Sequence, residues 1–96
     1  MKISQSATLI ISDHAMQRAA ERWNIDENKV HARIMEVFRI GIPYGAQIGD
    51  GVMFVLDDDV IAVRKRVGGV VCATALTKEM ADAESDRIHQ RTRGLR

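Results

Sequence analysis

Hydrophobic residues recur with the period of a helix in the first quarter of the chain. Their spacing of three and four residues would bury one helix face. These positions are Met16, Ala19, Ala20 and Trp23. The preceding pair, Ser12-Asp13, offers oxygens that can accept hydrogen bonds from the free amides at a helix start. The pattern therefore predicts a helix over about residues 13–23.

A second helical period follows after only a few residues. Its apolar positions are Val30, Ile34, Val37 and Phe38. Asp26 can cap the start of this helix, and Gly41 can end it. We expect a helix over about residues 27–40, and because the connection is short, the two helices should form a hairpin.

After Gly41 the hydrophobic period changes to two, which is the period of a β-strand. Four segments follow this period, residues 46–48, 52–56, 60–66 and 70–76. Between them stand three turn-forming triplets, Gly49-Asp50-Gly51, Asp57-Asp58-Asp59 and Val67-Gly68-Gly69. We expect an antiparallel meander of three to four strands, preceded by a short N-terminal strand at the β-branched run 8–11. The expected fold class is α+β.

Segments 52–56 and 70–76 are apolar on both faces, so both sides of the sheet should be covered. The helical hairpin can cover one side. Residues 79–92 have the composition of a C-terminal helix, but its apolar face is thin and consists of Met80, Ala83 and Ile88. The candidates for the second cover are therefore this helix, another protein chain, or a second copy in a homodimer.

Length and composition limit the number of domains and the environment of the chain. Its 96 residues can bury one core and not two, so we expect a single domain over residues 1–78, followed by a C-terminal helix and basic tail over 79–96. The lone Cys72 excludes an internal disulfide and favours a buried thiol in a reducing compartment. No apolar run approaches the length of a membrane span. The expected location is the cytoplasm, without membrane contact.

The net charge of +1 conceals separate acidic and basic clusters. Three consecutive basic residues, Arg64, Lys65 and Arg66, end one predicted strand, and by strand alternation the two arginines share a face. The last ten residues contain four arginines and no acid, namely Arg87, Arg91, Arg93 and Arg96. Such clusters suit nucleic-acid phosphates. The alternative is that they are solvated charges, and the near-neutral total argues against a dedicated non-specific nucleic-acid binder.

A stripe of His14, Arg18 and Arg22 lies along the first predicted helix at intervals of four. On a regular helix these positions fall within about 80° of one another and rise by about 12 Å, so one ligand could touch all three. A histidine base and two arginines suffice for RNA cleavage without metal, in which a ribose 2'-hydroxyl attacks the adjacent phosphorus. The alternative is that the stripe is the solvated side of the helix. Neither a metal cage nor a phosphate-binding glycine loop is evident, so we expect no metal and no cofactor.

The pattern His14-Ala15-x-x-Arg18-x-x-x-Arg22-x-x-Ile25 resembles the conserved helix of a small uncharacterised domain family. That family is similar to BrnT-type toxins and, more remotely, to RelE-like ribonucleases. The resemblance covers about residues 8–78 and implies a compact α+β domain from phage or toxin–antitoxin contexts. It also implies metal-independent RNA cleavage, with His14 as acid-base residue, Arg18 and Arg22 as phosphate ligands, and Thr74 as a hydroxyl facing the site.

Two functions of different classes follow. The first is a toxin-type, metal-independent endoribonuclease that acts on RNA and is held by an antitoxin. The second is a non-catalytic, phage-like or accessory protein that binds and inhibits a target protein or a nucleoprotein complex. In either case the nucleic-acid contacts are expected from Arg64, Lys65, Arg66, Arg87, Arg91 and Arg93.

Overall fold

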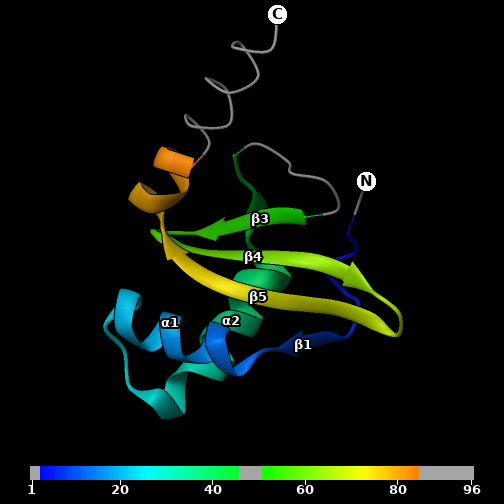
Figure 1. Cartoon of the computed structure of the whole chain (residues 1–96), viewed down its shortest axis with the longest axis horizontal. Coiled ribbons are helices and arrows are strands. Elements are labelled where there is room, and N and C mark those ends of the chain that lie inside the picture. The colour runs from blue at the N-terminus through cyan, green and yellow to red at the C-terminus, as the bar shows by residue number, and fades with distance from the viewer. Residues whose placement is uncertain (1–2, 46–50, 85–96) are drawn as a thin grey trace, which may run out of the picture.

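A five-stranded sheet forms the middle of the molecule, and a helical hairpin covers one of its faces (Figure 1). The structure is a computed structural model that describes residues 3–45 and 51–84. Its elements are β1 (Leu9–Ile11), α1 (Asp13–Trp23), α2 (Glu27–Ile40), β2 (Ile42–Pro43), β3 (Gly51–Leu56), β4 (Asp59–Arg66) and β5 (Gly69–Thr77). Residues 78–84 form a further helical segment. The α+β class and the predicted order of elements are confirmed.

The strands lie in the order β1-β5-β4-β3-β2. The segment from β3 to β5 is the predicted antiparallel meander, while β1 pairs in parallel with β5. Residues 42–43, which are not among the predicted strands, pair with β3 as a short edge strand. The predicted strand at 46–48 lies outside the described residues.

Helix α1 has the predicted bounds, but its buried face is rotated from the expected one. Ser12 caps the helix by accepting a hydrogen bond from the amide of Ala15 at 3.1 Å. The buried face consists of Ala15, Ala19 and Trp23, and α1 lies against β5. Met16 and Ala20 are only partly buried, because they lie toward α2 instead. The helix therefore divides its apolar residues between two neighbours.

Helix α2 begins and ends as predicted, and all four of its expected core residues are buried. Asp26 is the N-cap residue, although its side chain makes no capping hydrogen bond. Gly41 is the C-cap with an extended backbone (φ −68°), so left-handed geometry is not the reason for a glycine there. A Cβ atom at Gly41 would lie only 2.3 Å from the carbonyl oxygen of Val37. Close packing of the backbone requires the glycine.

The larger core cluster lies between the helical hairpin and the sheet. Phe38 of α2 meets Phe54 of β3 edge to face, with ring centroids 5.8 Å apart. Cys72 of β5 is fully buried in this cluster, as expected for a lone thiol. Burial raises the pKa of the Cys72 thiol to about 12, so the thiol stays protonated near neutral pH.

A smaller cluster covers part of the second face of the sheet. Ala81 of the helical segment 78–84 is fully buried there, against apolar residues of β3 and β4. The Tyr44 hydroxyl donates a hydrogen bond to the carboxylate of Asp82, and the Lys78 ammonium lies 5.9 Å from the centroid of the Tyr44 ring. The C-terminal segment is thus one cover of the second face. The expected apolar face was wrong in its described part, because Met80 and Ala83 are exposed and Ala81 is the buried residue; Ile88 lies outside the described residues.

The acidic turn between β3 and β4 is bound by Arg33 of α2. The Arg33 guanidinium reaches Asp59 at 2.8 Å, Asp57 at 3.2 Å and Glu36 at 2.6 Å. It also donates to the carbonyl oxygen of Leu56 at 3.3 Å. Burial by itself lowers the pKa of Arg33, but the hydrogen bonds to the three carboxylates outweigh it and raise the pKa. The arginine ties α2 to the sheet at all pH values where the acids are ionised.

We expect Arg33→Ala to lower the free energy of unfolding by about 1–3 kcal/mol, because three acids and a carbonyl lose their common partner. The matched control is Arg18→Ala, which removes a single exposed pair with Glu21 and should cost no more than about 0.5 kcal/mol. Urea denaturation followed by circular dichroism measures both. Equal losses for the two variants would contradict a structural role for Arg33.

Candidate functional site

The predicted stripe on α1 consists of side chains with different partners. The His14 side chain is exposed, and its imidazole has no hydrogen-bond partner within residues 3–45 and 51–84. The Arg18 guanidinium pairs with the Glu21 carboxylate at 3.2 Å, and both side chains are well exposed to solvent. These two residues therefore match the solvated helix face that periodicity allowed, with an open imidazole at its start.

Arg22 has a structural partner instead. Its Nη1 donates to the carbonyl oxygen of Ala75 in β5 at 2.7 Å, and the neighbouring Trp23 Nε1 donates to that of Leu76 at 2.8 Å. At the other end of α1, the Ser12 hydroxyl donates to the carbonyl oxygen of Ala73 at 3.3 Å. Arg22 therefore has a structural role, because it links α1 to β5.

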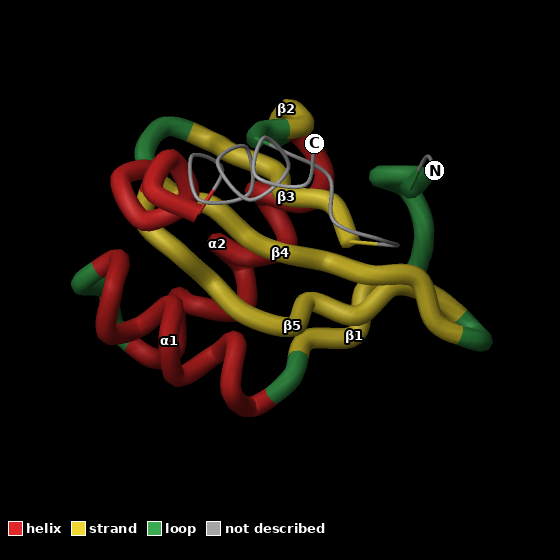
Figure 2. Tube along the Cα trace, turned by 45° about the horizontal axis from the view of Figure 1, so that its top comes forward, coloured by secondary structure: helices red, strands yellow, loops and turns green. Residues whose placement is uncertain are grey.

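The reason lies in the length of β1. It pairs with β5 only along residues 70–72, so the rest of the outer edge of β5 has no strand beside it. Figure 2 shows α1 running along β5 where β1 has ended. Side chains of α1 and its cap donate hydrogen bonds to three backbone carbonyl groups of this stretch of β5, and buried carbonyl groups without a donor are costly. Helix α1 therefore protects this edge.

Thr74, expected to face the same site, lies on the other side of the sheet. A register irregularity occurs where Ala62 pairs with Thr74 and the next residue, Val63, pairs with Cys72. Strict alternation from the buried Cys72 would put Thr74 on the face toward α1, but the extra residue reverses the alternation. Thr74 instead shares the face of its partner Ala62, which packs in the smaller cluster. The structure does not bring Thr74 together with His14.

The strand alternation predicted for residues 64–66 is confirmed. Lys65 pairs with the buried Val70, so it lies on the face toward the helices. Arg64 pairs with Val71, which in turn pairs with Ile10, and this row lies on the second face. Arg66 follows on the same side. We call this surface the basic sheet face, and it consists of Ile10, Arg64, Arg66, Val71 and Thr74.

Most arginines in the described part of the chain have protein partners. Arg18, Arg22 and Arg33 are bound as described above, and the Arg39 guanidinium donates to the carbonyl oxygens of Gln5 and Ala7 at 2.6 and 2.7 Å. In contrast, the side chains of Arg64, Lys65 and Arg66 are all exposed, and none of these side chains forms a hydrogen bond or ion pair with a described residue. The end of the β4–β5 hairpin thus concentrates free positive charge (Figure 1). The other expected nucleic-acid contacts, Arg87, Arg91 and Arg93, lie outside the described residues.

The hollow beside the stripe is formed by other side chains. A groove with a volume of about 410 Å³ lies between α1 and α2, and none of His14, Arg18 and Arg22 lines it. Within the described ranges no three His, Cys, Asp or Glu side chains come together as a set of metal ligands. The stripe therefore does not contribute to this groove.

No protein-family model, curated protein or solved structure matches the chain. The relation to BrnT-type toxins and RelE-like ribonucleases therefore stays a prediction. Of the helices in the described segments, none has the length and apolar character needed to cross a membrane.

We expect Arg22→Ala to lower the free energy of unfolding by about 1–2 kcal/mol, because the carbonyl oxygen of Ala75 loses its donor. His14→Ala, on the same side of the same helix, should change it by less than about 0.5 kcal/mol. Urea denaturation of both variants tests the assignment. A loss in His14→Ala as large as in Arg22→Ala would show that the stripe acts as one structural unit.

Proposed function

We propose that this chain is a non-catalytic RNA-binding protein that holds phosphate groups on its basic sheet face. RNA is bound either free or within a nucleoprotein complex, and it is not cleaved. The observation that carries the proposal is the exposed set of Arg64, Lys65 and Arg66, whose side chains form no hydrogen bond or ion pair with the described residues. Cations that a fold leaves unpaired side by side are available to an external anion.

The geometry of this set suits a phosphate backbone. Arg64 and Arg66 lie on one face of β4 and are roughly 7 Å apart along the strand, so the two guanidinium groups can reach neighbouring phosphates. Lys65 projects from the opposite face of the same strand end and widens the positive surface. The neighbouring side chains on the basic sheet face, Ile10, Val71 and Thr74, offer apolar area and one hydroxyl.

For stacking on bases, the same face offers only the planes of its two guanidinium groups. Its five residues include no aromatic side chain, and aromatic side chains are what single-stranded nucleic-acid binders use to hold bases. Binding should therefore depend on phosphate contacts and vary little with sequence. This chemistry also fits a nucleoprotein complex in which the chain contacts the phosphates of the RNA while other molecules recognise its bases.

The triple variant Arg64→Ala/Lys65→Ala/Arg66→Ala should bind single-stranded RNA more weakly. Its plot of log affinity against log salt concentration should be flatter by about two units, since each lost phosphate contact removes about 0.7. Fluorescence anisotropy with a labelled 20-nucleotide RNA, at several salt concentrations, measures both quantities. The wild-type protein should return the RNA at full length.

A matched pair of lysine variants separates local contacts from net charge. Lys29→Ala removes an exposed lysine on α2, and Lys65→Ala removes one at the hairpin end. Only Lys65→Ala should weaken RNA binding. Equal effects of the two variants would exclude Lys65 as a phosphate contact, and no change of the salt dependence in the triple variant would refute the basic sheet face as the binding surface.

A metal-independent endoribonuclease is the second candidate, and the exposed His14 favours it. The imidazole has no partner among the described residues, and Arg18 lies one turn along the same side of α1. A free base beside a cation is the minimum for attack of a 2'-hydroxyl on phosphorus. Against this function stand the binding of Arg22 to the sheet and the position of Thr74 on the opposite face.

Incubation of RNA with the protein in EDTA distinguishes the two functions. Under the first proposal the RNA stays intact. Under the second, products with 2',3'-cyclic phosphate ends appear and His14→Ala reduces their rate by about 10²-fold or more. His31→Ala, which removes an exposed histidine of α2, is the control and should keep full activity. Cleavage that depends on His14 and not on His31 would replace the first proposal by the second.

A further inference from the structure

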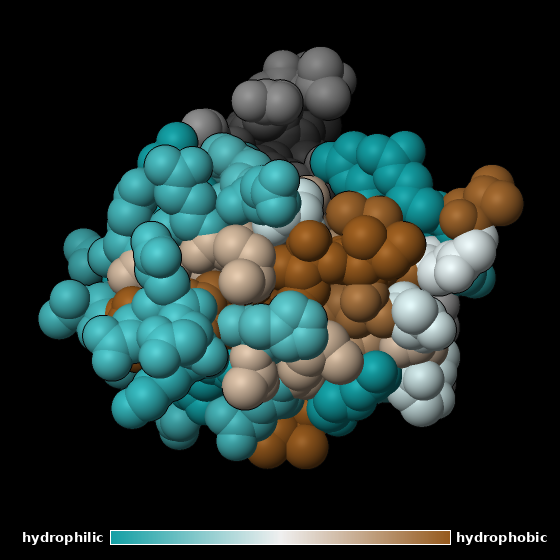
Figure 3. Space-filling model, turned by 90° about the horizontal axis from the view of Figure 1, so that it is seen from below, coloured by the Kyte–Doolittle hydropathy of each residue, from teal (hydrophilic) through white to brown (hydrophobic). Residues whose placement is uncertain are grey.

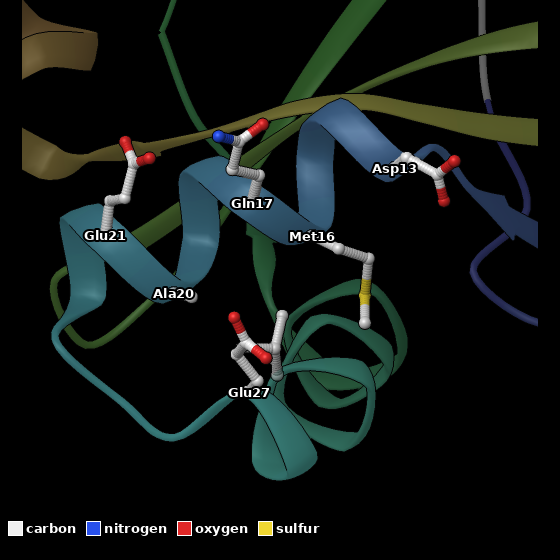
Figure 4. Close-up of a pocket in the computed structure, with 7 residues that line it drawn as sticks. Asp13, Met16, Gln17, Ala20, Glu21 and Glu27 are labelled. Atoms are coloured by element: carbon white, nitrogen blue, oxygen red, sulfur yellow. The ribbon is translucent and has the colours of Figure 1, made fainter.

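The groove between α1 and α2 has an apolar floor. Met16 and Ala20 form its α1 side and the buried Val30 its α2 side, and its volume is about 410 Å³. Figure 4 shows the Met16 side chain extending from α1 toward α2, with Ala20 facing the same space. This volume lies within the range of ligand pockets and accommodates a few side chains of a partner.

Acidic and polar side chains surround this floor. Asp13 and Glu21 come from the two ends of α1, Gln17 lies between them, and Glu27 comes from the start of α2. Figure 4 shows the Glu27 carboxylate extending from α2 toward α1. Neither Asp13 nor Glu27 forms an ion pair with another described residue, whereas Glu21 is paired with Arg18. The border of the groove is therefore negatively charged, and no basic residue is among those that line it.

The surrounding surface extends the apolar area. Leu9 and Ile11 of β1 are partly buried against the same core cluster as Met16 and Ala20. Figure 3, which views the molecule from below, shows hydrophobic side chains gathered in the middle of this surface, with hydrophilic side chains around them. An apolar centre with a polar border is the usual arrangement of a protein–protein contact surface.

We propose that the α1–α2 groove binds a segment of a partner protein in which an unbranched or γ-branched apolar side chain is flanked by lysine or arginine. The apolar side chain fills the space over Met16, Ala20 and Val30, and the flanking cations meet Asp13 and Glu27. Charge complementarity determines the class of the partner, because an acidic segment or a nucleic acid would be repelled by the same carboxylates. This inference is independent of the RNA-binding proposal, since the groove and the basic sheet face lie on opposite sides of the sheet.

Selection from a library of displayed 12-residue peptides tests the proposed chemistry. The immobilised wild-type protein should enrich peptides with one Leu or Met between Lys or Arg residues. A synthetic peptide of the enriched sequence should then cause saturable shifts in the amide spectrum of the ¹⁵N-labelled protein, centred on Met16, Ala20, Glu27 and Val30. Absence of enrichment, enrichment of acidic peptides, or shifts centred on β4 and β5 would each overturn the proposal.

Two variants with matched controls identify the interactions. Glu27→Lys and Met16→Ala should each raise the dissociation constant of the peptide by about 10-fold or more. Glu79→Lys, which changes an exposed acid in the first turn of the segment 78–84, and Met80→Ala, which truncates an exposed methionine there, should leave it within about 2-fold. Thermal melting shows whether each variant is folded. Since Glu27→Lys alters an exposed side chain, it tests the proposal even if Met16→Ala unfolds the protein.

Two further outcomes would also overturn the proposal. The first is a peptide affinity that is unchanged when the apolar residue of the peptide is replaced by alanine, because charge alone would then account for binding. The second is self-association of the wild-type protein, measured by light scattering, that Glu27→Lys abolishes. In that case the occupant of the groove would be a second copy of this chain and not a different protein.

Discussion

The unpaired edge of β5 is the constraint on which much of this structure depends. A strand of nine residues has a neighbour of only three residues on its outer side, and the carbonyl groups beyond that neighbour need donors. Ser12, Arg22 and Trp23 supply them from α1 and its cap. Because of these hydrogen bonds, α1 lies beside β5 with Ala15 and Ala19 facing the core. Met16 and Ala20 consequently face α2. The groove between the helices is a consequence of how α1 protects the sheet.

The arginines of the chain divide by the same logic. Arg22, Arg33 and Arg39 donate to backbone carbonyl groups at places where elements distant in sequence meet, and in doing so they stabilise the fold. Their planar guanidinium groups with several donors suit this work. Arg64 and Arg66 lie at the end of a hairpin, and their side chains form no hydrogen bond or ion pair with a described residue. Free charge therefore gathers on one side of the sheet, and the acidic groove lies on the other.

The candidate site shows how one irregularity changes a functional interpretation. The pattern on α1 and the threonine of the last strand suggest one constellation only if β5 alternates regularly. A bulge beside Ala73 reverses the alternation, which places Ala75 in the core and Thr74 on the basic sheet face. The expected set of site residues therefore does not lie on one surface. His14 and Arg18 remain exposed together on α1, without the other two members of the expected set.

The sequence by itself determined the α+β class, the position of both helices, the core face of α2 and the alternation of residues 64–66. Each of these depends on local spacing, which the chain contains in full. Only the tertiary structure decided the parallel pairing of β1, the rotated face of α1, the partners of Arg22 and Arg33, and the side on which Thr74 lies. These features depend on which distant backbone groups need a partner and on one extra residue in a strand. The spacing of hydrophobic residues along the chain reveals neither the unpaired backbone groups nor the extra residue.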